Sequence, residues 1–163
     1  MLVVKLIIEG LILGILLCLA CAYGIRHGAI NMVHLYDQNV QDRVVELGLT
    51  TKEEIKSKSM KFKAVCIPGE TIYVLFCVYI INGARGFFSG FWQMFVILSI
   101  MNLVDRFGID EYWVLHTDAW NIPGTEDLKP YITTEDKKVK WLMGTVGMAI
   151  IAAIFACIMA LIL

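Results

Sequence analysis

The sequence predicts an all-α polytopic membrane protein with four transmembrane helices and two cytoplasmic loops that carry short interfacial helices. Of its 163 residues, 58% are hydrophobic and 18% are charged, whereas soluble chains average about 45–50% apolar and about 25% charged residues. The apolar residues fall in four blocks, and nearly all charges lie between them. The length suits a single membrane domain, residues 1–163, and the net charge of −1 argues against a nucleic-acid binder.

The four blocks predict spans at about residues 2–23, 64–81, 87–104 and 141–163. A bilayer core about 30 Å thick needs roughly 20 apolar residues in a helix, and each block comes close to this length. We interpret the first block as a retained helix rather than a signal peptide, because its apolar run is long and its only basic residue is Lys5.

The distribution of basic residues predicts the orientation of these spans. Of the 14 Lys and Arg residues, seven lie in the loop 24–63 and five in the loop 105–140. Only Lys5 and Arg85 lie on the other side. Because basic loops stay in the cytoplasm, we expect both long loops to be cytoplasmic. The protein is then a multi-pass protein of the cytoplasmic (inner) membrane, with its N- and C-termini outside the cytoplasm.

The loops contain signals for short helices. Asp37 is placed to cap a helix that carries Val40, Val44 and Leu47 on one face, and Gly48 is placed to end it. This apolar face is expected to dock on the membrane surface or on the second loop. Thr51 with Glu54 and Thr133 with Asp136 have capping-box spacing and predict helices that lead into the second and fourth spans.

Small residues indicate how the spans pack. Gly10 with Gly14 and Gly86 with Gly90 have GxxxG spacing, which permits close approach of helices in lipid. The fourth span carries a stripe of alanines. Two interpretations stay open: a compact monomeric bundle, or binding of a membrane-protein partner or a second copy through the face of Ala149, Ala153, Ala156 and Ala160.

Two carboxylates fall inside the apolar blocks. Glu9 lies four residues after Lys5, which predicts a local ion pair. Glu70 follows Pro68-Gly69, a pair expected to kink or open the helix, and its expected partner is Arg106. Because ionisable groups in a bilayer are costly, Glu70 is either half of a structural ion pair or a functional site.

The second loop concentrates the other candidate site residues, Asp105, Arg106, Glu111 and His116, among several aromatic side chains. Histidine beside carboxylates can bind a divalent metal or transfer protons. No HExxH or HxxxH spacing is present, and all five cysteines lie in the apolar blocks, so we expect neither a metal nor another cofactor. The alternative is that the aromatic residues anchor the loop at the membrane surface while its charges face water.

Two resemblances follow from these stretches. The segment from Asn102 to Arg106 resembles the Asn-x-x-Asp-Arg signature of lipoprotein signal peptidases, which are four-span aspartic peptidases. The second aspartate motif of that family should follow near Trp120, where Pro123 and Gly124 stand instead, and the expected orientation is opposite, so we interpret the match as coincidental. The second loop and the stretches GIRHGA and ELGLTT resemble small uncharacterised bacterial membrane proteins, a resemblance that implies no activity.

Three functional hypotheses follow. The first is a subunit or accessory component that acts through its cytoplasmic loops. The second is a membrane-embedded enzyme that acts on lipid at the cytoplasmic interface with Asp105, Arg106, Glu111 and His116. The third is a small dimeric transporter in which Glu70 is the coupling site.

Overall fold

The computed structural model describes residues 1–163, and the chain is helical without strands. Four helices are long and apolar enough to cross a membrane, as predicted. The first is α1 (Leu2–Ile25), and the second is α3 (Lys52–Leu75) with a π-helical end (Phe76–Ile81). The third is α4 (Gly86–Leu103) with a π-helical extension (Val104–Val114), and the fourth runs through α5 (Thr134–Leu142), a π-helical turn (Met143–Gly147) and α6 (Met148–Ile162).

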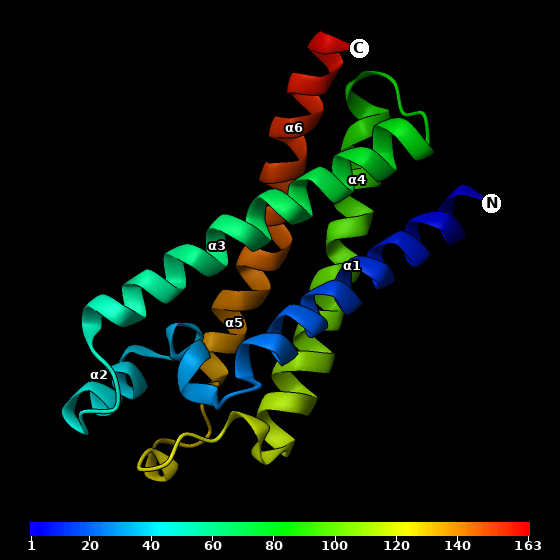
Figure 1. Ribbon diagram of the computed structural model, residues 1–163. Coiled ribbons are helices and arrows are strands. Elements are labelled where there is room, and N and C mark those ends of the chain that lie inside the picture. The colour runs from blue at the N-terminus through cyan, green and yellow to red at the C-terminus, as the bar shows by residue number, and fades with distance from the viewer.

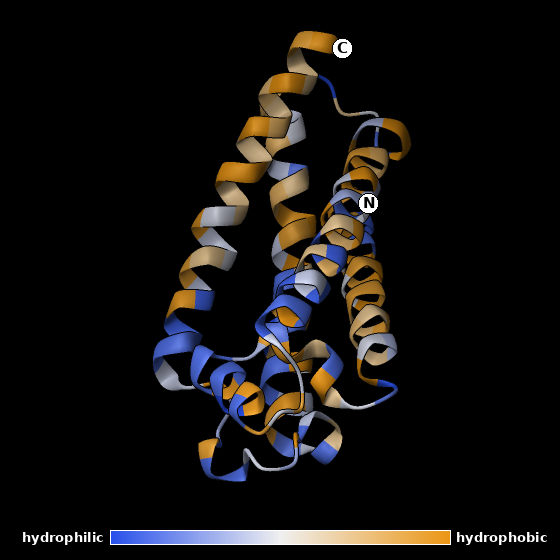
Figure 2. Cartoon of the chain, turned by 60° about the vertical axis from the view of Figure 1, so that its left-hand side comes forward, coloured by the Kyte–Doolittle hydropathy of each residue, from blue (hydrophilic) through white to orange (hydrophobic).

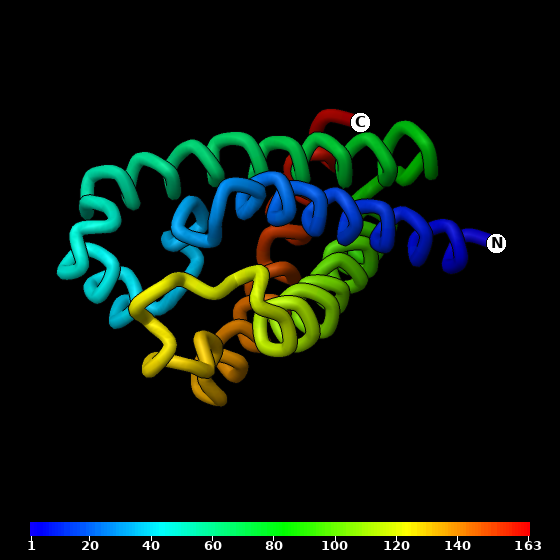
Figure 3. Tube along the Cα trace, turned by 60° about the horizontal axis from the view of Figure 1, so that its bottom comes forward, coloured from blue at the N-terminus to red at the C-terminus, as the bar shows by residue number.

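The two long connections lie at the same end of the four helices, and both chain ends and the turn from α3 to α4 lie at the opposite end (Figure 1). Seen from the loop end (Figure 3), the two connections lie side by side. Hydrophilic residues concentrate at this end, and hydrophobic ones dominate the rest of the helices (Figure 2). We call residues 26–51 and 115–133 the loop layer. This arrangement fits a multi-pass protein with one polar side.

The loop layer folds around an apolar core that it shares with Cys21, Ile55 and Ile109 of the long helices. Its regular elements are the 3₁₀ helix Ala29–Leu35, α2 (Gln38–Glu46) and the 3₁₀ turns Asp118–Trp120 and Glu126–Leu128. Val40 and Val44 of α2 are buried in one cluster with Trp120 and Ile122, so α2 docks on the second connection. Asp37 occupies the N-cap position of α2, although its side chain makes no capping hydrogen bond.

A second apolar cluster holds the long helices together, and α4 lies at its centre, in extensive contact with both α1 and α6. Gly10 permits this closeness on the α1 side, since a Cβ there would lie 2.5 Å from the Cβ of Ile100. On the α6 side, Ala152 and Ala156 are completely buried in the same cluster. Ala156 is therefore not free to contact a second subunit, while Ala149, Ala153 and Ala160 remain half-buried.

Two sequence expectations about the long helices need correction. The helix of the third span continues ten residues past the expected end at 104, because the polar residues after Val104 form ion pairs within the helix. Pro68 lies inside α3 and does not open it. A proline removes its own N–H from the helical bonding pattern and crowds the carbonyl four residues earlier, yet the turns on both sides of Pro68 are retained.

Helix capping behaves largely as the local sequence indicates. The Thr133 side chain accepts from the backbone N–H of Asp136, and the Asp136 carboxylate accepts from the N–H of Thr133, a complete capping box. At the start of α3, Thr51 accepts from the N–H of Glu54 at 3.2 Å. The Glu54 carboxylate accepts from the Thr50 hydroxyl and pairs with Lys58 instead of closing the box.

Candidate functional site

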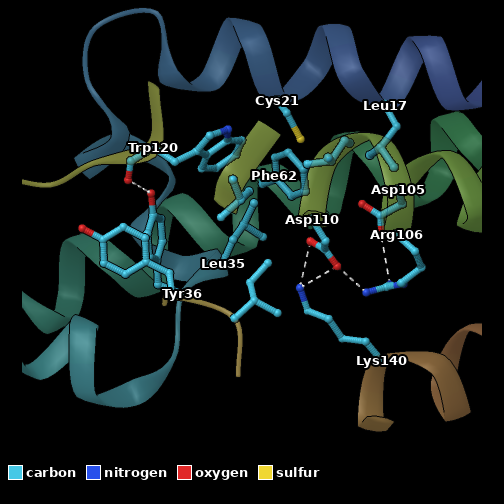
Figure 4. A pocket seen from close by; sticks show the side chains of 14 residues that line it. Leu17, Cys21, Leu35, Tyr36, Phe62, Asp105, Arg106, Asp110, Trp120 and Lys140 are labelled. Carbon is cyan, nitrogen blue, oxygen red and sulfur yellow. Dashed lines mark hydrogen bonds and ion pairs between the residues drawn. The ribbon is translucent and has the colours of Figure 1, made fainter. Parts of the chain in front are cut away.

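Four charged side chains meet where the third and fourth long helices enter the polar end of the molecule (Figure 4). The Arg106 guanidinium lies 2.9 Å from the Asp105 carboxylate and 2.6 Å from that of Asp110. The Lys140 ammonium donates to both carboxylate oxygens of Asp110 at 3.0 Å. We call Asp105, Arg106, Asp110 and Lys140 the ionic cluster. Two acids and two bases make it electrically balanced.

The ionic cluster is assembled from two local contacts, those of Arg106 with Asp105 and with Asp110, and one long-range contact. Arg106 and Asp110 are four residues apart in the π-helical extension, so they lie on one face of it. Asn102, one turn earlier, accepts from the Arg106 Nε at 3.2 Å and fixes the guanidinium. Lys140 comes from α5, whose start is set by the Thr133 capping box. The cluster therefore ties the third long helix to the fourth at the edge of the loop layer.

A cavity of about 290 Å³ opens beside the ionic cluster. The cluster forms its polar edge, and the remaining wall is mainly apolar and aromatic, with Cys21, Tyr36, Phe62 and Trp120 among its residues (Figure 4). Tyr36 donates its hydroxyl to the backbone carbonyl of Trp120. Burial raises the pKa of the Tyr36 hydroxyl well above its usual value, so this group stays a neutral hydrogen-bond donor.

The structure brings together only two of the four candidate site residues of the second loop. Asp105 and Arg106 belong to the ionic cluster, but Glu111 is exposed and forms an ion pair with Lys137. His116 is exposed as well, and its Nδ1 lies beside the backbone carbonyl of Glu111. A catalytic group made of these four side chains is therefore not assembled.

Two members of the ionic cluster were not expected from the sequence. Asp110 had a usable signal, because a carboxylate four residues after an arginine forms a standard helical pair. No local sequence pattern indicated Lys140, since it lies 30 residues from its partner Asp110 along the chain.

The predicted partners of both intramembrane carboxylates are wrong. Glu70 does not pair with Arg106, because Asp105 and Asp110 on the same helix already occupy the guanidinium. Glu9 does not pair with Lys5, whose ammonium donates to the Ile81 carbonyl at 3.2 Å.

Glu9 instead joins α1 to α3. Its carboxylate accepts from the Asn82 amide at 2.9 Å, and its backbone carbonyl accepts from the Tyr73 hydroxyl at 3.0 Å. Glu9 is buried and has a structural partner. Glu70 is half-buried and forms neither a hydrogen bond nor an ion pair within the chain.

A histidine in the loop layer is enclosed without partners. Both ring nitrogens of His34 are buried and have no hydrogen-bond partner, and the ring packs on Phe62 with centroids 5.3 Å apart. Burial, with a smaller contribution from Lys63 and Lys58, lowers the pKa of His34 below its usual value. His34 is therefore held in its neutral form.

No three His, Cys, Asp or Glu side chains gather in a group that could hold a metal ion. Cys18 and Cys21 have CxxC spacing within α1, and both are free thiols, as are the other three cysteines. Comparison with known proteins adds no assignment, because no protein-family model, no curated protein and no solved structure matches this chain.

Proposed function

We propose that this protein is a non-enzymatic component of a bacterial cytoplasmic membrane, a subunit or accessory protein that binds a partner protein through the loop layer on the cytoplasmic side. The single observation that carries this proposal is that the two long connections pack together on one apolar core at the polar end of the molecule. A connection that merely joins spans needs no such core, whereas a pre-ordered docking surface loses less conformational entropy on binding.

The charges of the site give little support to acid–base catalysis. A general acid or base must have a proton position that substrate can reach. In the ionic cluster, each carboxylate faces at least one cation, and the Asp110 carboxylate is shared by Arg106 and Lys140. The lipid-enzyme hypothesis has less support, because Glu111 and His116 lie apart from this cluster.

The outer surface of the loop layer offers apolar side chains for contact. Leu47 and Leu49 follow α2 and are each 48% exposed, although they lie in the polar end of the molecule. Charged side chains flank them at Glu46 and Lys52. An apolar centre with a charged rim is typical of protein-binding surfaces.

Photo-crosslinking in cells tests this proposal. A photoreactive residue at Leu47 or Leu49 is expected to capture a distinct partner protein. The same residue at Ile158 of α6, which is 45% exposed, serves as a control of matched exposure on a lipid-facing helix. Capture from Ile158 alone would shift the interface to the fourth span. Absence of capture from both loop positions, with recovery of a pure monomer in mild detergent, would refute the proposal.

A further inference from the structure

No cationic side chain of the protein pairs with Glu70. The apolar blocks 64–81, 87–104 and 141–163 contain no Lys, Arg or His, and the only basic residue of block 2–23 is Lys5. Lys5 donates to the carbonyl of Ile81, the last residue of the π-helical end that follows α3. The carboxylate of Glu70 is therefore left without a counter-charge from its own chain.

Two apolar cavities meet at Glu70. The larger, about 350 Å³, lies between α3, α4 and α6, and Val74, Met94, Leu98 and Phe155 are among its mainly hydrophobic lining residues. The smaller, about 210 Å³, lies between α1 and α3. Glu70 lines both. We call the larger one the α3–α6 groove.

The groove exists because α3 is attached mainly at its two ends. Near the loop layer, Lys58 donates to Asn31 at 3.1 Å and Phe62 packs on His34. Toward the other end, Tyr73 bonds to Glu9. Between these attachments, a Cβ added at Gly69 would meet nothing within 4 Å, so the middle of α3 stands away from the other helices.

The chemistry of this groove selects its occupant. A carboxylate in an apolar site is costly unless it holds a proton or faces a cation. An occupant with one positive charge and an apolar body would neutralise Glu70 and fill the hydrophobic wall at the same time. A phospholipid amine stays at the membrane surface, whereas Glu70 lies roughly 9 Å inside the predicted boundary at residue 64, at 1.5 Å per helical residue.

We propose that the α3–α6 groove is a binding site for an amphipathic organic monocation, an amine or onium ion on an apolar body, with Glu70 as its counter-ion. The site goes beyond the proposed partner-binding function and does not depend on it. A basic side chain of a partner's span is the competing occupant, and an absence of phosphonium binding by the isolated protein would favour it.

Two ions of nearly equal shape and opposite charge test this site. Tetraphenylphosphonium and tetraphenylborate are titrated calorimetrically into the purified full chain in a neutral detergent at pH 8. The phosphonium is expected to bind at least about tenfold more tightly than the borate, since a desolvated charge pair readily provides such a difference. Phe155→Ala, which removes an apolar wall, is expected to weaken phosphonium binding severalfold.

Carboxylate variants separate charge from folding. Glu70→Gln is expected to abolish the preference for the phosphonium, whereas Glu70→Asp retains it. Glu9→Gln changes the other intramembrane carboxylate and is also expected to retain it, because Glu9 faces Asn82 and not the groove. Equal binding of the two ions by the wild type, no phosphonium binding, or a Glu70→Gln preference within twofold of the wild type would overturn the proposal.

Discussion

Neutralising Asp110 is expected to destabilise the protein strongly, because this carboxylate joins two helices. Its side chain is 11% exposed and faces both Arg106 and Lys140. In Asp110→Asn, Arg106 keeps Asp105, while Lys140 loses its only ion-pair partner. Breaking a buried ion pair costs about 3–5 kcal/mol. Lys140 is 35% exposed and regains some hydration in the variant. We therefore expect the free energy of unfolding to fall by about 3 kcal/mol, the lower end of that range.

The matched control is Glu111→Gln, one residue further along the chain. Glu111 and its partner Lys137 have side-chain exposures of 48% and 36%, so this ion pair is solvated. Exposed pairs contribute about 0.2–1 kcal/mol. At roughly 2–4 °C per kcal/mol for a chain of this size, Asp110→Asn should lower the melting midpoint by about 6–12 °C and Glu111→Gln by at most about 4 °C.

Thiol labelling during heating measures these midpoints. Cys21 is 4% exposed, lines the cavity beside the ionic cluster, and becomes reactive when this region opens. Replacing Cys18, Cys66, Cys77 and Cys157 by alanine leaves Cys21 as the only reporter. The double variant Asp110→Asn, Lys140→Met should recover part of the lost stability, because the unpaired ammonium is removed. Equal midpoints for Asp110→Asn and Glu111→Gln would refute the argument that the ionic cluster holds the helices together.

Three further outcomes follow from the structure. Gly10→Ala should lower the free energy of unfolding by about 1–3 kcal/mol, because the added Cβ would overlap Ile100. Gly69→Ala places its Cβ in open space, so it should leave the stability unchanged or raise it by up to about 1 kcal/mol. Thiol labelling during heating compares the two variants. The pKa of His34 is lowered in the folded state, so the unfolded chain binds the extra proton as pH falls below about 6.5. Above that pH His34 is neutral in both states and imposes no protonation penalty on the folded state. The melting midpoint should therefore fall between pH 7.5 and 5.5 more steeply than in His34→Gln; equal slopes would contradict this. Alkaline phosphatase fused after Leu163 should be active in bacteria, and the same enzyme fused within the loop layer should be inactive; the reverse pattern would invert the predicted orientation.

Features encoded within a few residues could be predicted from the sequence. The four apolar blocks match the four long helices, and the caps at Thr51 and Thr133 form because a threonine and the N–H three residues later are fixed by local geometry. Hydropathy underestimated the length of the helices, however, because polar segments such as Val104–Val114 continue them past the apolar blocks.

Contacts between distant helices could not be predicted in the same way. Lys140 meets Asp110 only because α5 is placed beside the π-helical extension, and the sequence contains no periodicity that records this. Arg106 had three possible carboxylates, and the two on its own helix were reached at lower entropic cost than Glu70 on another. A candidate site built from charges in different loops therefore depends on packing that local patterns do not encode.

The two intramembrane glutamates show where a structural explanation is sufficient. Glu9 has a structural role that explains its burial in α1. Its contacts with Asn82 and Tyr73 join α1 to the end of α3 and the segment that follows it. The same explanation fails for Glu70, which lies at the part of α3 that is not attached to its neighbours and between two cavities that remain open. If Glu70 only stabilised the fold, Glu70→Gln would cost stability as Glu9→Gln does. We expect the opposite order: Glu9→Gln lowers the melting midpoint, and Glu70→Gln leaves it unchanged or raises it, because an unpaired carboxylate in an apolar groove is a cost to the folded state.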